Sequence, residues 1–500
     1  MVSPAPAFGI GRPRNPPLRA AWRELPFGVD TASAFRALFG KSAAAFWLDS
    51  SRADGERSRW SFMGDAGGPH AAIVTYDAAK GRLVRRDRNG AHIEAGGIFA
   101  YLERSLAGAP LEAPPCPFPG GHIGWLGYEL QSECGSGIVR HAATPDAFFI
   151  RADRFIAVDH LSARTYVVAL APPSHEAVAQ AWVHAMQARL AALSPREPSP
   201  LPAAGTGAAR PVEFRLDRDR PTYLADIRQC LEWIGEGQTY QVCLTNELSC
   251  TADVDPLDLY CTLRRLNPAP YAAFIRWPGG AVLSASPERF LSVDARGRVE
   301  AKPIKGTIRR DPDPAQDAIL AQALAASEKD RAENLMIVDL VRNDLSRVCE
   351  IGSVEVPSLM AVESFATVHQ LVSTVQGQLR GDASAIDLIR AAFPGGSMTG
   401  APKLHTLGLI DRLERRARGI YSGALGWIGD DGAADLSIVI RTIVAQGDRL
   451  SIGAGGGIVA DSEPQAEFDE MLLKARALMR AIALATTGEG GEDRYRVAGL

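Results

Sequence analysis

Hydrophobic and polar positions form short, alternating segments in the first two hundred residues. Residues 148–158 and 164–170 have this pattern, which is typical of strands with one buried face. Residues 175–193 instead repeat apolar positions at a helical spacing and predict a helix that closes this part of the chain. The first half is therefore expected to be α+β.

The pattern is denser after residue 213. Three segments have a helical period: residues 222–235, 327–348 and 463–485. Four shorter segments have strand character: residues 241–250, 271–277, 281–290 and 291–299. We expect these strands to follow one another through short turns that contain Gly, Pro or Asp, without crossover helices, and strands joined in this way pair antiparallel. The predicted fold class is α+β, with antiparallel sheet.

One break in composition divides the chain. Residues 193–210 are rich in Pro, Ala, Gly and Ser and have no apolar period, which is typical of a linker or a long surface loop. We therefore expect five parts: a disordered leader at 1–19, an N-terminal region at 20–192, a linker at 193–212, a catalytic domain at 213–487 and a flexible tail at 488–500. The leader contains Pro and Arg but lacks the apolar stretch of a secretory signal.

Composition excludes several classes of protein. The 500 residues carry a net charge of −4, which gives no overall attraction to nucleic acid or to an anionic membrane. No apolar run approaches the length of about 18 residues that spans a bilayer. The seven cysteines include no C-x-x-C pair and are expected to be reduced thiols. We therefore expect a cytoplasmic globular protein that binds any anion locally.

Lys305 is the first candidate for chemistry. It lies in the segment PIKGT, between an X-Pro dipeptide and a Gly-Thr turn, where a lysine can be held at the end of a strand. Removal from water would lower its pKa and make the neutral amine available as a nucleophile. From the local sequence alone, a surface lysine in a basic loop with Lys302, Arg309 and Arg310 is the alternative.

Two pairs of acidic residues lie on predicted helices. Asp330 and Glu333 are three positions apart, as are Glu467 and Glu470, so each pair shares a helical face. Carboxylates from two helices can hold Mg²⁺, which completes its coordination with water and an anionic substrate. The alternative is that both helices carry these acids toward solvent. Lys474, four positions after Glu470, would then form an ordinary helical ion pair.

Glycine-rich loops and one arginine complete the candidates. GGSMTGAPK at 395–403 and GAGGGIV at 453–459 are not nucleotide-binding fingerprints, but each offers backbone N–H groups that can converge on a carboxylate or phosphate. Arg441 lies within the apolar run SIVIRTIV. Its guanidinium must therefore be paired inside a site or lie on an edge strand, because burial of an unpaired charge is too costly.

Together these segments resemble the chorismate-utilising enzymes. Within that family they are more similar to component I of aminodeoxychorismate synthases than to component I of anthranilate synthases. The N-terminal half matches more loosely, through GHIGWLGYE at 121–129. The segments that carry the dense resemblance are TYQV at 239, SASPERF at 284, PIKGT at 303, DRAENLMIVDLVRNDLSRV at 330, SFATVHQLVSTV at 364, FPGGSMTGAPK at 393, IYSGALGWI at 420, IRT at 440, GAGGGIV at 453 and E-x-x-E-x-x-x-K at 467.

The resemblance implies a fold and a set of residue roles. The fold is two large antiparallel sheets packed together with helices outside, and the cofactor is Mg²⁺, bound by Glu333 and Glu470 with Asp330 and Glu467 behind them. Glu288 is implied as the general acid/base, and Thr307 and His369 as neighbours of the substrate ring, where His369 assists departure of the C4 hydroxyl. The groups implied to hold the chorismate carboxylates are Arg441, Tyr421, Lys474 and the amides of Gly455, Gly456 and Gly457.

Two positions favour amination. The family motif P-I-x-G-T carries Lys in aminodeoxychorismate synthases and Ala in anthranilate synthases, and here it carries Lys305. By resemblance, Lys305 attacks C2 of chorismate as the C4 hydroxyl leaves, and ammonia then displaces it to give 4-amino-4-deoxychorismate for p-aminobenzoate and folate synthesis. Gln241 stands where water-using relatives have a lysine base, and glutamine cannot act as a base. Anthranilate synthesis remains the alternative activity.

Two binding partners are also implied. No segment resembles a glutaminase triad, so ammonia is expected from a separate glutamine amidotransferase subunit. Residues 48–60 and 267–271 resemble the site where the family binds tryptophan. Asp49 and a longer charged loop depart from the usual pattern of that site. The residues expected to line this possible tryptophan site are Ser50, Arg57, Trp60, Pro270 and Tyr271.

Overall fold

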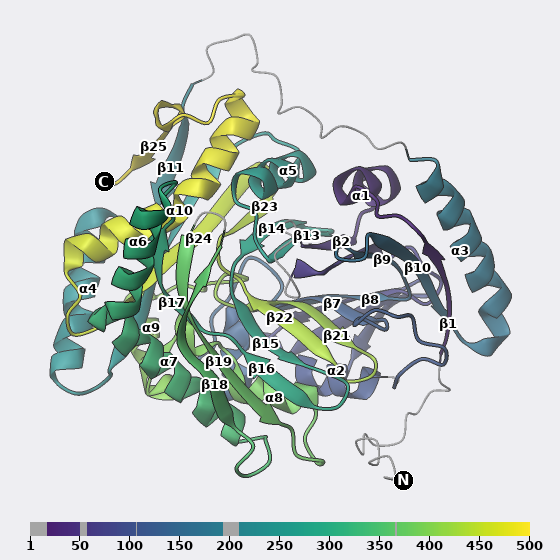
Figure 1. The fold of residues 1–500 in the computed structure, drawn as a ribbon, viewed down its shortest axis with the longest axis horizontal. Helices are drawn as coiled ribbons and strands as arrows, with labels where there is room; N and C mark the ends of the chain where they lie inside the picture. The colour runs from purple at the N-terminus through teal and green to yellow at the C-terminus, as the bar shows by residue number, and fades with distance from the viewer. Residues whose placement is uncertain (1–17, 51–57, 107, 194–209, 366–367) are drawn as a thin grey trace.

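The computed structural model describes residues 18–500 except 51–57, 107, 194–209 and 366–367. In these residues the strands form two large sheets, one of 13 strands (sheet A) and one of 12 (sheet B), with helices around them (Figure 1). Nearly all strand pairs are antiparallel, and the exception is the parallel pair at one edge of sheet A. The predicted class, two packed antiparallel sheets flanked by helices, is confirmed.

Sheet A combines strands from both halves of the chain. Its path of neighbours, to which β20 (Gly400–Ala401) adds a short pair with β12, is β1 (Arg19–Leu25), β10 (Arg164–Ala171), β9 (Arg154–Asp159), β3 (Trp60–Asp65), β2 (Ala45–Asp49), β13 (Tyr271–Trp277), β14 (Gly280–Ser286), β23 (Thr442–Gln446), β24 (Arg449–Ile458), β12 (Gln241–Thr251), β11 (Val212–Leu216) and β25 (Tyr495–Ala498).

Sheet B is mixed in the same way. Its path, to which β18 (Glu355–Ser364) adds a pair with β19, is β17 (Ile304–Arg309), β19 (Val368–Gln378), β16 (Arg298–Ala301), β15 (Arg289–Val293), β22 (Ala434–Ile438), β21 (Ala424–Gly429), β7 (Gly121–Leu126), β8 (Ala147–Ala152), β4 (Ala72–Asp77), β5 (Arg82–Asp87) and β6 (Gly90–Glu94).

The helices cover the outer faces of the sheets. Those packed on sheet A are α1 (Thr31–Phe39), α3 (Glu176–Ala191), α4 (Arg220–Gly235), α5 (Pro256–Leu266), α9 (Lys403–Glu414) and α10 (Pro464–Thr487). Those associated with sheet B are α2 (Ile98–Ser105), α6 (Pro314–Ala326), α7 (Glu328–Ser346) and α8 (Ala385–Ala392). The short 3₁₀ helix η2 (Tyr128–Cys134) follows β7. Among the described residues, no helix has both the length and the apolar character needed to cross a membrane.

The inner faces of the sheets form a common aromatic core. Trp125 from β7 and Trp277 from β13 lie edge to face with 5.2 Å between ring centroids, and Phe62 packs against Phe118 in the same cluster. Side chains of this size remove a large apolar area from water when two sheets pack face to face. This core fixes the sheets relative to each other and therefore holds groups that lie between them.

The chain crosses between the sheets at two places where the sequence predicts a continuous strand. Residues 148–158 divide into β8 in sheet B and β9 in sheet A, and residues 281–290 divide into β14 in sheet A and the start of β15 in sheet B. The second crossing contains Pro287 and Glu288, between the end of β14 and the start of β15. It therefore holds Glu288 between two sheets.

Two other expectations need correction. A helix, α5, lies between the predicted strands at 241–250 and 271–277; Asp255 caps it and Pro256 occupies its first turn. The expected flexible tail at 488–500 includes β25, which pairs with β11. The expected leader, to residue 17, and most of the expected linker lie outside the described residues.

Candidate active site

The site forms where two neighbouring strands of sheet A separate. Pairing of β24 with β23 ends at Ile452, whereas its pairing with β12 continues to Ile458. The segment Gly455, Gly456 and Gly457 lies in this one-sided stretch, and Arg441 precedes β23 with a positive φ of 51°. The sheet therefore opens between Arg441 and the three glycines.

Because Gly457 has no side chain, the side chains of Gln241 and Lys305 can both lie against the β24 backbone. A Cβ atom at Gly457 would lie 2.4 Å from Nε2 of Gln241 and 3.1 Å from Nζ of Lys305, so no side chain fits there without displacing one of them. Gln241 is fully buried, and its amide nitrogen and oxygen have no hydrogen-bond partner among the described residues. An unsatisfied buried amide is costly, which indicates a polar ligand at this position.

Lys305 lies on β17 and is paired with a carboxylate from α7. Its Nζ atom is 3.4 Å from Oε2 of Glu333, and each side chain is 13% exposed. Burial alone would lower the pKa of Lys305, but the attraction of Glu333 outweighs it and raises the pKa above its ordinary value. The ammonium form is therefore stabilised here, and the amine becomes nucleophilic only after this proton leaves.

Glu470 and Lys474 on α10 lie close enough to this pair for the charges of Glu470 and Lys305 to interact. Nζ of Lys474 lies 2.8 Å from Oε1 of Glu470 and donates to the carbonyl of Gly455 at 3.0 Å. Burial raises the pKa of Glu470, but the ammonium groups of Lys474, Lys329 and Lys305 outweigh it and leave the pKa below its ordinary value. Glu470 is therefore held as a carboxylate.

Lys329 is a cation that three carboxylates share. Its Nζ atom lies 3.2 Å from Oε1 of Glu467, which also accepts a hydrogen bond of 2.7 Å from Oγ of Ser462. Burial lowers the pKa of Lys329, but Glu467, Glu333 and Glu470 together raise it. Asp330, on the same helix, packs against Gly306. The carboxylates of both predicted pairs thus lie in one region, whereas the helical spacing predicted only that each pair shares a face of its own helix.

Glu288 is a buried acid close to Lys305 and Lys474. It follows β14 and is 8% exposed, with Ser397 as a side-chain hydrogen-bond partner. Burial raises its pKa to about 7, although Ser397 and the positive charges of Lys305 and Lys474 oppose the shift. A carboxyl group with this pKa can give and take a proton near neutral pH.

Arg441 and Tyr421 form the cationic and phenolic part of the site. Burial lowers the pKa of Arg441, and the nearby Tyr421 and Glu470 oppose this. No hydrogen bond or ion pair involves the Arg441 guanidinium among the described residues. Tyr421 packs over Gly453, where a Cβ atom would lie 2.2 Å from its ring. A partly buried guanidinium with no partner among the described residues is suited to bind an anionic substrate group.

Thr307 and His369 are engaged elsewhere in this state. Oγ1 of Thr307 accepts a hydrogen bond of 3.4 Å from Gln370, and Thr307 is exposed. The imidazole of His369 lies between Asp317, 2.9 Å from Nε2, and Ser364, 2.8 Å from Nδ1. The structure therefore does not bring these two residues into hydrogen-bond contact with Lys305, Glu333 or Glu288 among the described residues.

A buried ion pair that the sequence analysis missed supports the site from behind. Arg418 forms two hydrogen bonds of 2.8 Å with Glu414 and also donates to the carbonyls of Met398 and Cys243, each at 2.8 Å. Its guanidinium lies 4.3 Å from the ring centroid of Tyr128. Arg418 therefore joins α9, β12, η2 and the glycine loop after α8. Neither residue stood out in the charged segment LERRARG, because helix-end charges are usually solvated.

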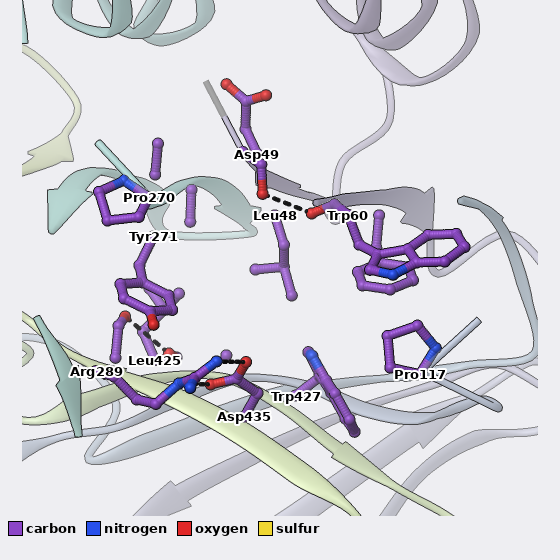
Figure 2. A pocket seen from close by; sticks show the side chains of 16 residues that line it. Leu48, Asp49, Trp60, Pro117, Pro270, Tyr271, Arg289, Leu425, Trp427 and Asp435 are labelled. Carbon is purple, nitrogen blue, oxygen red and sulfur yellow. Dashed lines mark hydrogen bonds and ion pairs between the residues drawn. The ribbon is translucent and has the colours of Figure 1, made fainter. Parts of the chain in front are cut away.

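A cavity lies between the two sheets and is lined by none of the active-site residues described above. It has a volume of about 280 Å³, and Figure 2 shows Trp60, Pro270 and Tyr271 at its walls. Ser50, another residue of the expected tryptophan site, also lines it, whereas Arg57 lies outside the described residues. Arg289 forms two hydrogen bonds of 3.0 Å with Asp435 on the sheet B side.

Comparison with known proteins decides the family. Residues 44–480 match the chorismate binding enzymes. The chain belongs to this family. Among chorismate binding enzymes, the aminodeoxychorismate synthase of Streptomyces griseus is 48% identical to it over 97% of this chain and 67% of that protein. Aminodeoxychorismate synthase component 1 of Klebsiella aerogenes is 38% identical over 93% of this chain and 99% of that protein.

A solved chorismate binding enzyme has the same fold. The crystal structure of anthranilate synthase component I from Streptococcus pneumoniae superposes with a TM-score of 0.73 at 30% identity, covering 84% of this chain and 92% of that one. The resemblance found in the sequence motifs is thereby confirmed for the family and for the fold. It places the glycine loops and the paired carboxylates within a chorismate binding enzyme.

Proposed function

We propose that this chorismate binding enzyme converts chorismate and ammonia into 4-amino-4-deoxychorismate, the precursor of p-aminobenzoate and folate. The observation that carries the proposal is Lys305, a buried lysine beside Glu333 and the unpaired amide of Gln241. Similarity to aminodeoxychorismate synthases at 48% identity supports it. Gln241 cannot activate water as a base, so ammonia is favoured as the nucleophile.

Lys305 supplies the covalent step. After its proton leaves, the ε-nitrogen attacks C2 of chorismate, both conjugated ring double bonds shift, and the C4 oxygen takes a proton and departs as water. Ammonia then adds at C4 and gives up a proton, both double bonds shift back, and the lysine nitrogen leaves C2 and recovers a proton. The sum is chorismate plus ammonia giving aminodeoxychorismate plus water.

Glu288 is the acid/base in this proposal. Its pKa of about 7 means that both protonation states are populated near neutral pH. It can therefore give the proton that the departing oxygen requires and take one back from the amine. His369 can assist the same departure only if its imidazole exchanges Asp317 for the substrate hydroxyl, and Thr307 must turn inward to approach the ring.

Mg²⁺ is proposed as the cofactor, held by Glu333 and Glu470 with Asp330 and Glu467 behind them. Carboxylate oxygens suit this hard cation, and the described residues contain no cluster of three or more side chains able to hold a metal by themselves. Coordination of Mg²⁺ by two protein carboxylates, substrate and water agrees with the preference of the ion for oxygen and with the lack of a larger cluster among the described residues. The bound ion would neutralise the charge of a substrate carboxylate.

Chorismate carries two carboxylates. We propose that cationic side chains, a phenol and backbone N–H groups of the site bind them. Arg441 offers a partly buried guanidinium that has no partner among the described residues, Tyr421 a phenol and Lys474 an ammonium group at the edge of the opened sheet. The N–H groups of Gly455 to Gly457 lie along the same edge. Cationic and hydrogen-bond donors at fixed positions stabilise a dianion without reorganising during the reaction.

Two partners belong to the proposal. The Klebsiella and other relatives are named component 1, and we propose that a glutamine amidotransferase subunit supplies ammonia to this chain. We also propose that the 280 Å³ cavity beside Trp60 and Tyr271 binds tryptophan, because its walls combine aromatic rings with charged groups.

The test is product analysis by mass spectrometry. The protein is incubated with chorismate, Mg²⁺ and ammonium chloride and compared with Lys305→Ala and with Lys80→Ala, a control at a lysine that is 58% exposed. We expect aminodeoxychorismate from the unmodified protein and from the control, and a loss of about 10³-fold or more in Lys305→Ala. Anthranilate with pyruvate as products, or a fully active Lys305→Ala, would overturn the proposal in favour of anthranilate synthesis.

A further inference from the structure

Three carboxylates of the candidate site each form an ion pair with a lysine. The pairs are Lys305 with Glu333 at 3.4 Å, Lys474 with Glu470 at 2.8 Å and Lys329 with Glu467 at 3.2 Å. Lys305 and Lys474 have roles in the proposed function, as nucleophile and as a donor to the substrate. Lys329 has no role there, although its charge lies among the same carboxylates.

The start of α7 is an unfavourable position for a lysine. Ser327 caps this helix, and Lys329 is its second residue. The helix dipole repels a cation there and favours acids, such as the neighbouring Glu328 and Asp330. The charge of Lys329 therefore does not stabilise α7 by itself and is offset by groups that face it.

These groups come from two helices. The Glu467 side chain on α10 is 3% exposed, and its Oε1 atom accepts hydrogen bonds from both Lys329 and Ser462. Glu333 follows Lys329 by one turn of α7, and Glu470 follows Glu467 by one turn of α10. Burial lowers the pKa of Lys329, but these three carboxylates outweigh it and raise the pKa. The ammonium group thus interacts with both carboxylates proposed to hold Mg²⁺ and with one behind them.

Lys329 and Mg²⁺ are attracted to the same negative charges. A divalent ion that approaches Glu333 and Glu470 meets the repulsion of the Lys329 ammonium group, which also satisfies Glu467. The Lys329 side chain is 44% exposed and flexible, so it can turn toward water when the ion binds. Glu467 is held in place by Ser462 and cannot yield in the same way.

We propose that Lys329 competes with Mg²⁺ for the carboxylates of α7 and α10 and thereby weakens binding of the ion to the protein without chorismate. This inference rests on the Mg²⁺ site of the proposed function. Lys329 is not a catalytic residue in this account: it joins α7 to α10 at low Mg²⁺ concentration and gives way at high concentration.

The first experiment measures Mg²⁺ binding in the absence of chorismate. Isothermal titration calorimetry with MgCl₂, at constant ionic strength, compares the unmodified protein with Lys329→Gln and Lys329→Arg. The matched control Lys80→Gln removes a lysine from an exposed ion pair with Asp77. We expect Kd for Mg²⁺ to fall about tenfold or more in Lys329→Gln and to stay unchanged in the control. Lys329→Arg keeps the charge and should bind Mg²⁺ as the unmodified protein does.

The second experiment separates competition from a purely structural role. Thermal unfolding is recorded with EDTA and over a series of MgCl₂ concentrations. With EDTA, Lys329→Gln should unfold at a lower temperature than the unmodified protein, because the carboxylates repel one another. Mg²⁺ should raise its unfolding midpoint more than that of the unmodified protein, because the variant binds the ion more tightly. A purely structural role would lower the midpoint equally at every Mg²⁺ concentration.

The outcomes distinguish this inference from the proposed function. Equal or weaker Mg²⁺ binding by Lys329→Gln, or a midpoint difference that does not depend on Mg²⁺, would overturn the competition and leave the Mg²⁺ site and amination intact. If neither the unmodified protein nor Lys329→Gln responded to MgCl₂ in either measurement, the proposed Mg²⁺ site would be overturned and this inference with it.

Discussion

At the scale of single residues, the absence of a side chain at Gly457 is as important as the charged groups around it. Gln241, Lys305 and the β24 backbone share a space that a single methyl group would fill. Because Lys305 is also paired with Glu333, displacing its Nζ atom would disturb the ion pair and the position of the proposed nucleophile.

Gly457→Ala should therefore remove most activity while the protein stays folded. A displacement of about 1 Å at a reacting group can cost about 100-fold in rate. Steady-state kinetics with chorismate and ammonium chloride measure the loss. The control is Gly408→Ala in helix α9, where a Cβ atom would meet nothing within 4 Å, and this variant should keep full activity. Equal activity in the two variants would contradict the packing argument.

Burial of Glu288 makes stability depend on pH. Its folded pKa of about 7 is above the ordinary value of 4.5, so the folded protein binds this proton more tightly than the unfolded chain does. Its contribution to stability is therefore complete below pH 4.5 and is lost as the pH rises through 7. The variant Glu288→Gln lacks this titratable carboxyl group, so its stability should not change with pH for this reason.

The free energy of unfolding of Glu288→Gln minus that of the unmodified protein should thus increase by up to about 3 kcal/mol between pH 5 and pH 8. Urea unfolding at several pH values measures this difference. A difference that stays constant over that range would show that the carboxyl group is not buried as described.

The sequence could predict which residues form the site, but it could not predict which of their charged side chains form ion pairs with one another. Spacing of three and four along a helix placed the carboxylates of Glu333 and Glu470 on defined faces, and the X-Pro segment placed Lys305 at a strand. It could not predict that Glu333 would raise the pKa of Lys305, because burial and a charged partner act in opposite directions and only the distance decides between them. The sequence analysis also missed Lys329, because its carboxylate partner Glu467 lies on another helix and only the folded structure brings the two together.

At the scale of elements, the points where a strand leaves one sheet for the other were invisible to periodicity. Residues 281–299 are apolar enough to be one or two strands in a single sheet, yet the chain changes sheets at Glu288. Which sheet a strand joins depends on pairing with distant segments, as β14 with β23 and β15 with β22. Helix α5, by contrast, could have been predicted, because Asp255 and Pro256 form a typical helix start. It was missed because the flanking segments were interpreted as consecutive strands joined by a turn.

The Arg418–Glu414 pair is expected to contribute strongly to stability. Burial raises the pKa of Glu414, but Arg418 outweighs it and leaves the pKa at about 2. Arg418→Met should lower the free energy of unfolding by about 3–5 kcal/mol, because it leaves a buried carboxylate without its partner. Urea denaturation measures the loss.

The control for this prediction is Arg342→Met, which breaks an exposed ion pair of 3.4 Å with Asp339. Exposed pairs contribute about 0–1 kcal/mol, so this variant should differ little from the unmodified protein. If the two variants were equally stable, the buried pair would not be the support for α9 and the glycine loop that the geometry indicates.

At the scale of the whole molecule, both sheets are built from both halves of the chain. β2 pairs with β13 in sheet A, and β7 pairs with β21 in sheet B. The cavity proposed for tryptophan lies between these junctions and has walls from both sheets (Figure 2). A ligand that fills it contacts both sheets at once and is released when they separate.

Tryptophan should therefore raise the thermal unfolding midpoint in a concentration-dependent way. A ligand that binds only the folded state stabilises it by about 2.7 kcal/mol at 100 times its Kd. Differential scanning fluorimetry with L-tryptophan measures the shift, and L-leucine, which lacks an indole ring to stack on Trp60 and Trp427, is the control. No shift at millimolar tryptophan would remove this ligand from the proposed function.

The short strand β25 also affects how the molecule meets copies of itself. It covers the outer side of β11. The rings of Phe214 on β11 and Tyr495 on β25 meet edge to face, and Nε of Arg496 donates to Glu213 at 3.0 Å. An uncovered strand edge is a template for addition of a strand from another chain, and a short, charged strand is a poor one. The last strand of the chain thus protects the largest sheet against aggregation at that edge.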